Sequence, residues 1–515
     1  MKKHNRIIPF IILTASVFMV AGCSKFLDRP LENQTRSNID YTNLSLMYQP
    51  VSGAYSVATR GGYASWVHTF LRTSQSDDII PYTSYPEVDL INSFQYGPSV
   101  KSFWAINDFW SNYYGVIIAC NGALAELDEF GKNIPAGDAE NTKLLSRYKA
   151  ELRFWSGLGH YWLCRYFGDV PVLAGKESLA PAYLDTVRKT KVNDVRRYVM
   201  SEMDFCISNL EDARPNQAQH IGGITKYTAL MLKAKAAMDI AGNDNASPMW
   251  DIVLDCTNQV INSKKFSLFP DFYQLFKKPG KLCDESILEF QYSDFGASTG
   301  DIVTSGFNWG SWSNLFLFQG PDNKYGAPIS GPGWLVPTQK VVDFLTNRND
   351  LIRLKTTIQY CGINGDPNTY VLTPDGDTVS GNGARKKYFN GKAYYPKSQM
   401  TPGRNDYGAN NNVRVFRYSE ILLMNAEALI RKGQNGDDPF NLVRKRVELL
   451  PITNVTIDQL LEERHAEFAC EWWGERFNDM VRSDRATAQL PGFVKGKSEF
   501  LPIPQAQEDR NSNLK

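Results

Sequence analysis

The sequence lacks the patterns that carry metal, nucleotide and acyl-transfer chemistry. Only five histidines occur among 515 residues, and they stand apart from one another with no HExxH or other zinc-ligand spacing. There is no GxSxG nucleophile elbow and no phosphate-binding P-loop. We therefore expect no metal, no cofactor and no catalytic residues.

Cysteine is scarce and is not arranged as a framework. Eight occur and none forms a CxxC pair, which argues against a disulfide scaffold and a structural zinc site. A free cysteine in an apolar helical stretch packs as a small hydrophobe. We expect that role for Cys120, Cys164, Cys206 and Cys470.

Long apolar runs are confined to the N-terminus. Three basic residues precede an apolar stretch from Ile7 to Val20, which suits a secretory signal and is too short to span a bilayer. The stretch is followed by Ala21-Gly22-Cys23, which is typical of a bacterial lipoprotein. We expect residues 1–22 to be removed and Cys23 to be acylated, which anchors a chain durably without a span. The alternative is an ordinary secretory signal followed by a cysteine by chance.

An excess of positive charge is also missing. Residues 1–22 hold three of the 56 basic residues and none of the 55 acidic ones, so 56 − 3 = 53 basic groups face 55 acidic groups in the processed chain. A surface with this charge balance lacks the excess of positive charge that binds the phosphate backbone of a nucleic acid. No nucleic-acid partner is expected.

Helical periodicity dominates most of the chain. Apolar residues recur at helical spacing in stretches that are paired by short loops, which favours an α-hairpin solenoid, although no clean tetratricopeptide repeat is visible. The predicted fold class is mostly α, a tetratricopeptide-like scaffold of helix pairs with a loop-rich, partly β insertion in the C-terminal half. Helices are expected at residues 103–127, 144–167, 191–211, 224–242, 249–262, 418–431, 439–449 and 457–481.

Residues 283–413 differ in composition from the helical stretches, because they are rich in Gly, Ser, Asn, Pro and aromatic residues. Strand-like pieces flank the turn Pro374–Asp377, as in a β-hairpin. A calcium site at Asp366, Asp375 and Asp377 is an alternative, but turn chemistry explains these residues more simply. Long irregular segments in a globular domain are usually functional, so we expect this segment to face a ligand.

Acidic residues recur at every fourth position near the C-terminus. Because like charges at that spacing repel on a helix, the stripe needs cationic partners. Two such carboxylates would also serve a glycosidase, but the interleaved aromatic residues are typical of a packed helix surface, and we favour an ion-paired scaffold. The stripe comprises Glu463, Glu467, Glu471, Glu475 and Asp479, and its candidate partners are Arg444, Arg446, Arg464, Arg476 and Arg482.

Aromatic residues form two groups beside polar side chains. Rigid amphipathic rings next to hydrogen-bonding groups suit the apolar faces and polar rims of sugars. The alternative for each ring alone is a place in the local core. The predicted ligand-binding residues are Trp66, Arg72, Tyr82 and Tyr85 in the first group, and Asn308, Trp309, Trp312, Tyr325 and Trp334 in the second.

Seven ordered motifs, together with the lipoprotein signal, resemble the SusD/RagB family of outer-membrane lipoproteins over essentially the whole processed chain. The resemblance implies one SusD-like domain, residues 23–515, with halves at 23–282 and 283–515. Family ligand sites come from variable loops, so no site residue is carried over. The motifs include Cys23-Ser24-Lys25-Phe26-Leu27-Asp28, Tyr166-Phe167-Gly168-Asp169-Val170-Pro171, Arg417–Ala428, Glu463–Arg482, and Phe500–Gln505 with Asn511 and Asn513-Leu514 behind it.

The resemblance also implies a function. It suggests a non-catalytic receptor that is lipid-anchored at the cell surface in the outer membrane. Such a receptor captures oligosaccharides and delivers them to a TonB-dependent SusC-like transporter. The expected partners are therefore a glycan, that transporter and the membrane. Two alternatives are capture of peptides, as in the RagB-like branch, and a surface glycosidase that uses carboxylates of the last helix.

Overall fold

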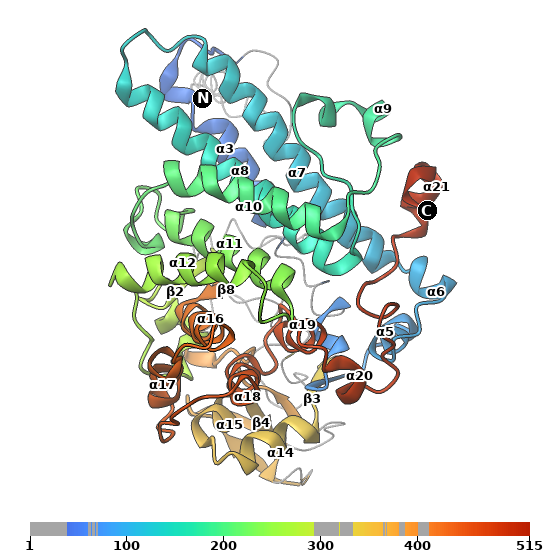
Figure 1. Ribbon diagram of the computed structural model, residues 1–515. Helices are drawn as coiled ribbons and strands as arrows, with labels where there is room; N and C mark the ends of the chain where they lie inside the picture. The colour runs from blue at the N-terminus through green and yellow to red at the C-terminus, as the bar shows by residue number, and fades with distance from the viewer. Residues whose placement is uncertain are drawn as a thin grey trace, which may run out of the picture.

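The computed structural model of the chain describes residues 39–59, 71–292, 333–363, 368–380, 387–399 and 411–515, together with Tyr63, Val67, Gln319 and Asp366. Residues 1–22 and Cys23 lie outside this part, so the expected signal and lipid anchor stay predictions. Within it, helices predominate and strands occur only as short pairs (Figure 1). None of the described helices is long and apolar enough to cross a membrane.

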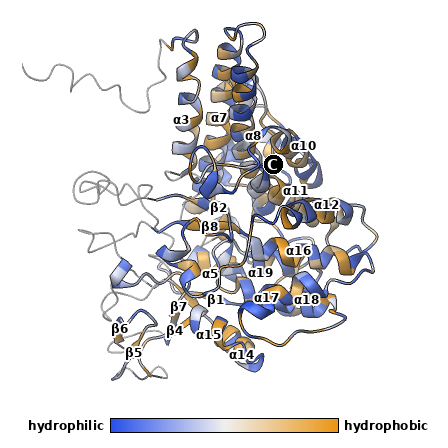
Figure 2. Ribbon diagram, turned by 90° about the vertical axis from the view of Figure 1, so that its left-hand side faces the viewer, coloured by the Kyte–Doolittle hydropathy of each residue, from blue (hydrophilic) through white to orange (hydrophobic). Residues whose placement is uncertain are grey.

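The N-terminal half is a row of antiparallel helices in which each packs on the next one in the sequence (Figure 1). This arrangement confirms the prediction of helix pairs joined by short loops. Figure 2 shows the later helices of this row on one side of the molecule and the short strands on the other. The row consists of α3 (Gln49–Val57), α7 (Trp104–Gly131), α8 (Ala139–Phe167), α10 (Val192–Asn209), α11 (Lys226–Ala241) and α12 (Met249–Asn262).

Capping residues set the ends of these helices. The Asp138 side chain accepts a hydrogen bond from the Asn141 backbone N–H at 3.0 Å, so α8 begins five residues before the predicted Leu144. The side chain of Thr225 caps α11 through a reciprocal pair of bonds with Thr228. A cap satisfies backbone N–H groups that have no partner inside the helix. Apolar periodicity therefore marks the buried face of α8 but misses its polar first turn.

The C-terminal half continues the row. Helix α16 (Tyr418–Arg431) packs on α12 and carries α17 (Asp437–Arg446) and α18 (Ile457–Phe468) on its other side. The remaining helices of more than one turn are α5 (Pro86–Asn92), α14 (Gln339–Asn347), α15 (Leu351–Thr357), α19 (Glu475–Arg482) and α21 (Gln505–Arg510), and the shortest are α6 (Pro98–Lys101), α9 (Pro181–Leu184) and α20 (Ala486–Gln489).

The insertion at residues 283–413 begins and ends at the same place beside the helical row. Strand β2 (Ser286–Phe290) pairs antiparallel with β8 (Val413–Arg417), and all residues of both strands are buried. The described residues between them form two further antiparallel pairs, and another strand between them pairs with a strand from the N-terminal half. These pairs are β1 (Ile79–Pro81) with β3 (Leu335–Pro337), β4 (Ile358–Tyr360) with β7 (Tyr388–Asn390), and β5 (Tyr370–Leu372) with β6 (Thr378–Ser380).

The predicted hairpin around Pro374–Asp377 is confirmed as β5 and β6. The predicted loop-rich, partly β insertion also contains two helices that were not predicted, α14 and α15. Helix α14 has a clear local signal: the Thr338 side chain accepts a hydrogen bond from the Val341 N–H, and Val341, Val342 and Leu345 are buried on one face. The rich glycine and asparagine content on either side concealed this pattern.

The predicted continuous helix at residues 457–481 was wrong. It is broken between α18 and α19, where Cys470 and Gly474 have φ angles of 60° and 69°. The turn places the indole N–H groups of Trp472 and Trp473 on the Arg414 carbonyl, at 3.0 and 2.6 Å. Burial of both rings outweighs the local preference for helix.

The seven cysteines in the described part of the chain are free thiols, and six are buried. The four that the sequence placed in helical cores, Cys120, Cys164, Cys206 and Cys470, are among them. Burial raises the pKa of each of these four thiols. The prediction of inert, buried cysteines is therefore confirmed.

One buried acid joins α3 to α8. Glu151 is 4% exposed, and its carboxylate accepts a hydrogen bond from the Tyr55 hydroxyl at 2.6 Å. The nearest cation, Arg147, lies 3.9 Å away. Burial raises the pKa of Glu151 to about 7, and the Tyr55 bond and Arg147 offset only part of that rise. The folded chain therefore holds a proton here that the unfolded chain releases near pH 4.3.

We predict that Glu151→Gln removes part of the pH dependence of stability. Because the folded-state pKa is raised, the stability that the proton contributes is complete below about pH 4.3 and is lost as the pH rises to about 7. Relative to the variant, the wild type should lose about 1.4 kcal/mol of unfolding free energy per pH unit within that window. Urea unfolding of both proteins at several pH values measures this difference in unfolding free energy. If the unfolding free energies of wild type and variant changed in parallel with pH, Glu151 would not be the group responsible.

Candidate functional site

The acidic stripe is the centre of a buried ionic network. The Glu467 carboxylate pairs with Arg353 at 3.0 Å, with Arg417 at 2.8 Å and with Arg446, and all four side chains are at most 3% exposed. Burial alone would raise the pKa of Glu467, but the three guanidinium groups hold it well below its usual value. The carboxylate is therefore ionised, and all three of these guanidinium groups bind it.

The other members of the stripe are bound in the same way. Glu471 pairs with Arg417 and Lys392, at 2.7 and 2.9 Å. A glycosidase needs two carboxylates that a sugar can reach, whereas these carboxylates are buried and held by cations. The prediction of an ion-paired scaffold is confirmed, with one correction: Arg476, a predicted partner of the stripe, pairs with Asp77 instead. The remaining pairs are Glu463 with Arg353, Arg348 and Arg444, Glu475 with Arg165 and Lys235, and Asp479 with Arg464 and Arg482.

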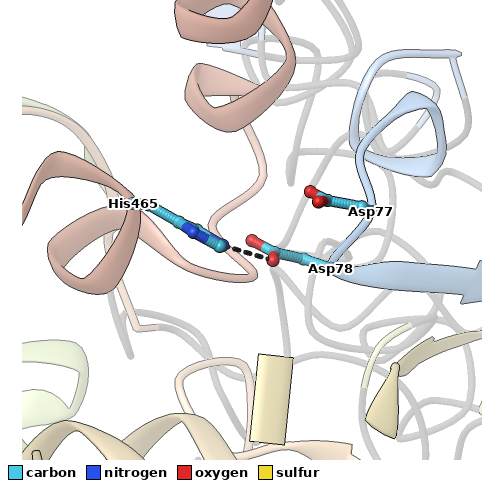
Figure 3. A group of neighbouring side chains, drawn as sticks. All are labelled: Asp77, Asp78 and His465. Atoms are coloured by element: carbon cyan, nitrogen blue, oxygen red, sulfur yellow. Dashed lines mark hydrogen bonds and ion pairs between the residues drawn. The ribbon is translucent and has the colours of Figure 1, made fainter. Parts of the chain in front are cut away.

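A smaller cluster lies at the start of β1, where Asp77 and Asp78 face His465 of α18 (Figure 3). The Nε2 atom of His465 lies 2.7 Å from the Asp78 carboxylate. Ligand atoms of all three residues lie within 4.8 Å of one another, which is close enough to share a metal ion. However, Arg476 binds Asp77 through two hydrogen bonds of 2.9 and 3.0 Å, and Lys340 lies 2.6 Å from it.

These contacts give the cluster a structural role. Two cations already neutralise Asp77, and they would have to move before a metal ion could replace them. The backbone carbonyls of Asp77 and Asp78 also accept hydrogen bonds from Thr338, which follows β3. We therefore assign the cluster to the scaffold that fixes β1 and β3 against α18 and α19. Sequence analysis missed it because His465 is 387 residues from Asp78.

The β1–β3 ribbon brings the two predicted aromatic groups together. Ile80 pairs with Val336, and the Tyr82 N–H donates to the Trp334 carbonyl at the end of the ribbon. The ring centroids of Tyr85 and Trp334 are 5.9 Å apart, with an interplanar angle of 89°. Residues some 250 positions apart in the sequence thus form one cluster.

A further ring from α7 joins this cluster. Trp104 lies 5.6 Å from Tyr85, centroid to centroid, at an angle of 66°. The side chains of Tyr82 and Trp104 are 47% and 38% exposed, and those of Tyr85 and Trp334 are half-buried. Rings of this size normally pack in a core or an interface. We call these four residues, Tyr82, Tyr85, Trp104 and Trp334, the aromatic platform.

Sequence analysis missed Trp104, although a signal was present. The residue begins α7, and its neighbours Ala105, Ile106 and Phe109 are buried on the face that packs into the molecule. Trp104 lies off that face, where a tryptophan has no core to fill. A large ring outside the apolar stripe of its helix was the available sign.

Arg72 does not belong to the platform, and that part of the prediction is corrected. Its side chain is 0% exposed and lies over the rings of Tyr166 and Phe477, at 4.4 and 4.7 Å from their centroids. A guanidinium in that position stabilises the interior and cannot reach a ligand. Five predicted residues lie outside the described part of the chain and stay predictions: Trp66, Asn308, Trp309, Trp312 and Tyr325.

Comparison with known proteins places the chain near one family. The sequence profile of the SusD family matches residues 337–499. SusD-like protein P2 of Formosa agariphila is 23% identical over 100% of this chain and 99% of its own length, and a SusD-like protein of Bacteroides ovatus is 21% identical over 92% and 81%. The surface glycan-binding protein A of Bacteroides thetaiotaomicron, solved with laminarihexaose, superimposes with a TM-score of 0.72 at 21% identity, covering 92% and 98% of the two chains.

We predict that Glu467→Ala destabilises the protein strongly. It leaves three buried arginines without their shared partner, and breaking one side of a buried ion pair costs about 3–5 kcal/mol. Denaturant unfolding measures the loss. Glu129→Ala is the matched control, because Glu129 forms an exposed pair with Lys132, and its removal should leave the midpoint unchanged. Equal effects of the two variants would contradict the central role of Glu467.

Proposed function

Because the chain belongs to the SusD family, we propose that it captures oligosaccharides on the aromatic platform and performs no chemistry on them. The observation that carries this proposal is the convergence of the rings of Tyr85, Trp104 and Trp334 from three segments on one partly exposed cluster. The same chain keeps its clustered carboxylates buried against arginines. Ring stacking is available to a ligand, and acid catalysis by this stripe is not.

The chemistry of a sugar fits such a cluster. A pyranose presents C–H groups on its faces and hydroxyls on its rim, so a flat ring covers the face while neighbouring polar groups bind the rim. Tyr82 supplies both, since the residue is 47% exposed and its ring carries a hydroxyl. We propose that Trp66, Asn308, Trp309, Trp312 and Tyr325 extend the platform, because they flank its residues in the sequence. The laminarihexaose complex of the Bacteroides thetaiotaomicron protein, which shares the fold, supports a glycan as the ligand class.

The same family supports a cellular role. We propose that residues 1–22 are a signal peptide. Acylated Cys23 then anchors the domain of residues 23–515 to the outer surface of the outer membrane. A SusC-like transporter receives the captured glycan. A lipid anchor suits a chain whose described helices do not span a membrane. Capture outside the cell then requires transfer to a transporter, because an intact oligosaccharide does not cross a bilayer unaided.

We predict that the purified protein binds a glycan and that the triple variant Tyr82→Ala, Trp104→Ala, Trp334→Ala loses at least about tenfold in affinity, equivalent to about 1.4 kcal/mol. A glycan array that includes laminarihexaose identifies the ligand, and calorimetry measures the affinity. Leu450→Ala is the control, because Leu450 is 81% exposed outside the platform. Circular dichroism of the triple variant checks that its fold is intact.

Three outcomes would overturn the proposal. Unchanged affinity in a folded triple variant would remove the platform as the site. Binding of a protein digest, with no glycan bound on the array, would establish peptide capture instead. Release of reducing ends from a bound polysaccharide by the purified protein would establish an enzyme.

We predict that Cys23→Ser abolishes membrane attachment. Without the thiol no thioether to diacylglycerol can form, and the processed chain loses its acyl groups. Detergent phase partitioning of cell extracts measures the change, with wild type in the detergent phase and the variant in the aqueous phase. Cys283→Ser, which alters a half-buried thiol in the folded domain, should partition like the wild type. A Cys23→Ser protein that still enters the detergent phase would contradict lipid anchoring.

A further inference from the structure

A cavity of about 190 Å³ is lined by residues of α7, of the segment around α9 and of the C-terminal segment that contains α21. Figure 1 shows where these three elements lie. Trp110 and Tyr114 of α7 form one apolar wall, and Leu184 and Leu514 form the other. Trp110, Tyr114 and Leu514 are each less than 9% exposed, so little of their surface is open to solvent. Arg510 also lines it.

The C-terminal segment is fastened across this cavity. The side-chain amide of buried Asn511 donates hydrogen bonds to the carbonyls of Leu184 and Val187, at 3.2 and 2.8 Å. Its side-chain oxygen accepts the Asn513 N–H at 3.0 Å. These bonds hold the wall that carries Leu514 and Arg510 at a fixed place opposite α7. The cavity is therefore a built feature and not a gap between mobile ends.

No described neighbour accounts for Gly115 in the middle of α7. Glycine destabilises a helix interior relative to alanine, and in α8 Gly157 makes room for Met203, which lies 2.8 Å from an added Cβ. At Gly115 an added Cβ would meet no heavy atom within 4 Å, and the residue lines the cavity. The space that glycine leaves open is thus available to a ligand.

The size and charge of the cavity define a ligand class. A cavity of about 150 Å³ accepts a benzene ring, so this one holds a single ring or an equivalent apolar group. The Nε of Arg510 is held by Asp185 at 2.6 Å, and within the described residues its two Nη nitrogens have no hydrogen-bond partner. The Arg510 side chain is 49% exposed, so these two nitrogens can donate hydrogen bonds to a second carboxylate beside Asp185.

We propose that this cavity is a second binding site, separate from the aromatic platform, for a small aromatic carboxylate. The ring enters between Trp110 and Leu514 above Gly115, and the carboxylate accepts hydrogen bonds from Arg510 at the mouth. A sugar is a poor alternative, because neither Trp110 nor Tyr114 presents an exposed face for stacking. The site does not depend on glycan binding by the platform.

Calorimetry with trans-cinnamate and the purified protein tests this proposal. Saturable binding to one site is expected. Gly115→Leu should abolish it by filling the cavity, and its fold should persist because the added side chain meets open space and leucine favours a helix. Gly53→Leu is the matched control, since Gly53 is an exposed glycine of α3 that also has no neighbour within 4 Å, and this variant should bind cinnamate like the wild type.

Arg510→Gln separates the charge from the cavity. This variant should weaken cinnamate at least tenfold and leave the affinity for cinnamyl alcohol, which has the same ring without the carboxylate, unchanged. Absence of cinnamate binding at millimolar concentration would overturn the site. Binding that persists in folded Gly115→Leu would overturn its location, and equal weakening of acid and alcohol in Arg510→Gln would overturn the ligand class.

Discussion

Charge neutralisation around one buried carboxylate holds the C-terminal half together. Glu467 is bound by Arg353 of α15, Arg417 of β8 and Arg446 of α17, so a single acid joins the insertion, the strand that ends it and the following helix pair. Buried ion pairs contribute little net stability relative to apolar packing, but they heavily penalise any arrangement that leaves one member unpaired. The network therefore specifies how these elements meet more than it stabilises them.

The aromatic platform depends on that arrangement. Its ribbon, β1 with β3, is fixed at one end by the contacts of Asp77 and Asp78 with Arg476 and His465, which belong to the same C-terminal helices as the ionic network. Trp104 comes from the other direction, at the start of α7 in the helical row. The rings meet only because the row and the insertion are each held rigidly. A rigid platform loses little entropy when a ligand binds.

Local patterns predicted the helical row well and its long-range contacts poorly. Periodicity located α12 and α16 to the residue, because an amphipathic helix in a layered fold records its buried face in the sequence. It failed at residues 469–474, where the burial of Trp472 and Trp473 breaks the helix. It predicted that the acidic stripe is ion-paired. It did not predict Arg353 or Arg417 as partners, because both lie far from Glu467 in the sequence and no regular spacing connects them to it. Tyr82, Tyr85 and Trp334 were found from composition, but only the ribbon shows that they are neighbours.

The pairing of β2 with β8 fixes where the insertion at residues 283–413 begins and ends. Both strands are buried in the scaffold, and the chain enters and leaves the insertion side by side. Loops between them can lengthen or shorten without altering the distance that the scaffold must bridge, provided that Arg353 of α15 still reaches Glu467 and β3 still pairs with β1. An exchange of the whole insertion at these two strands would therefore succeed only if the incoming segment carried its own cation for Glu467.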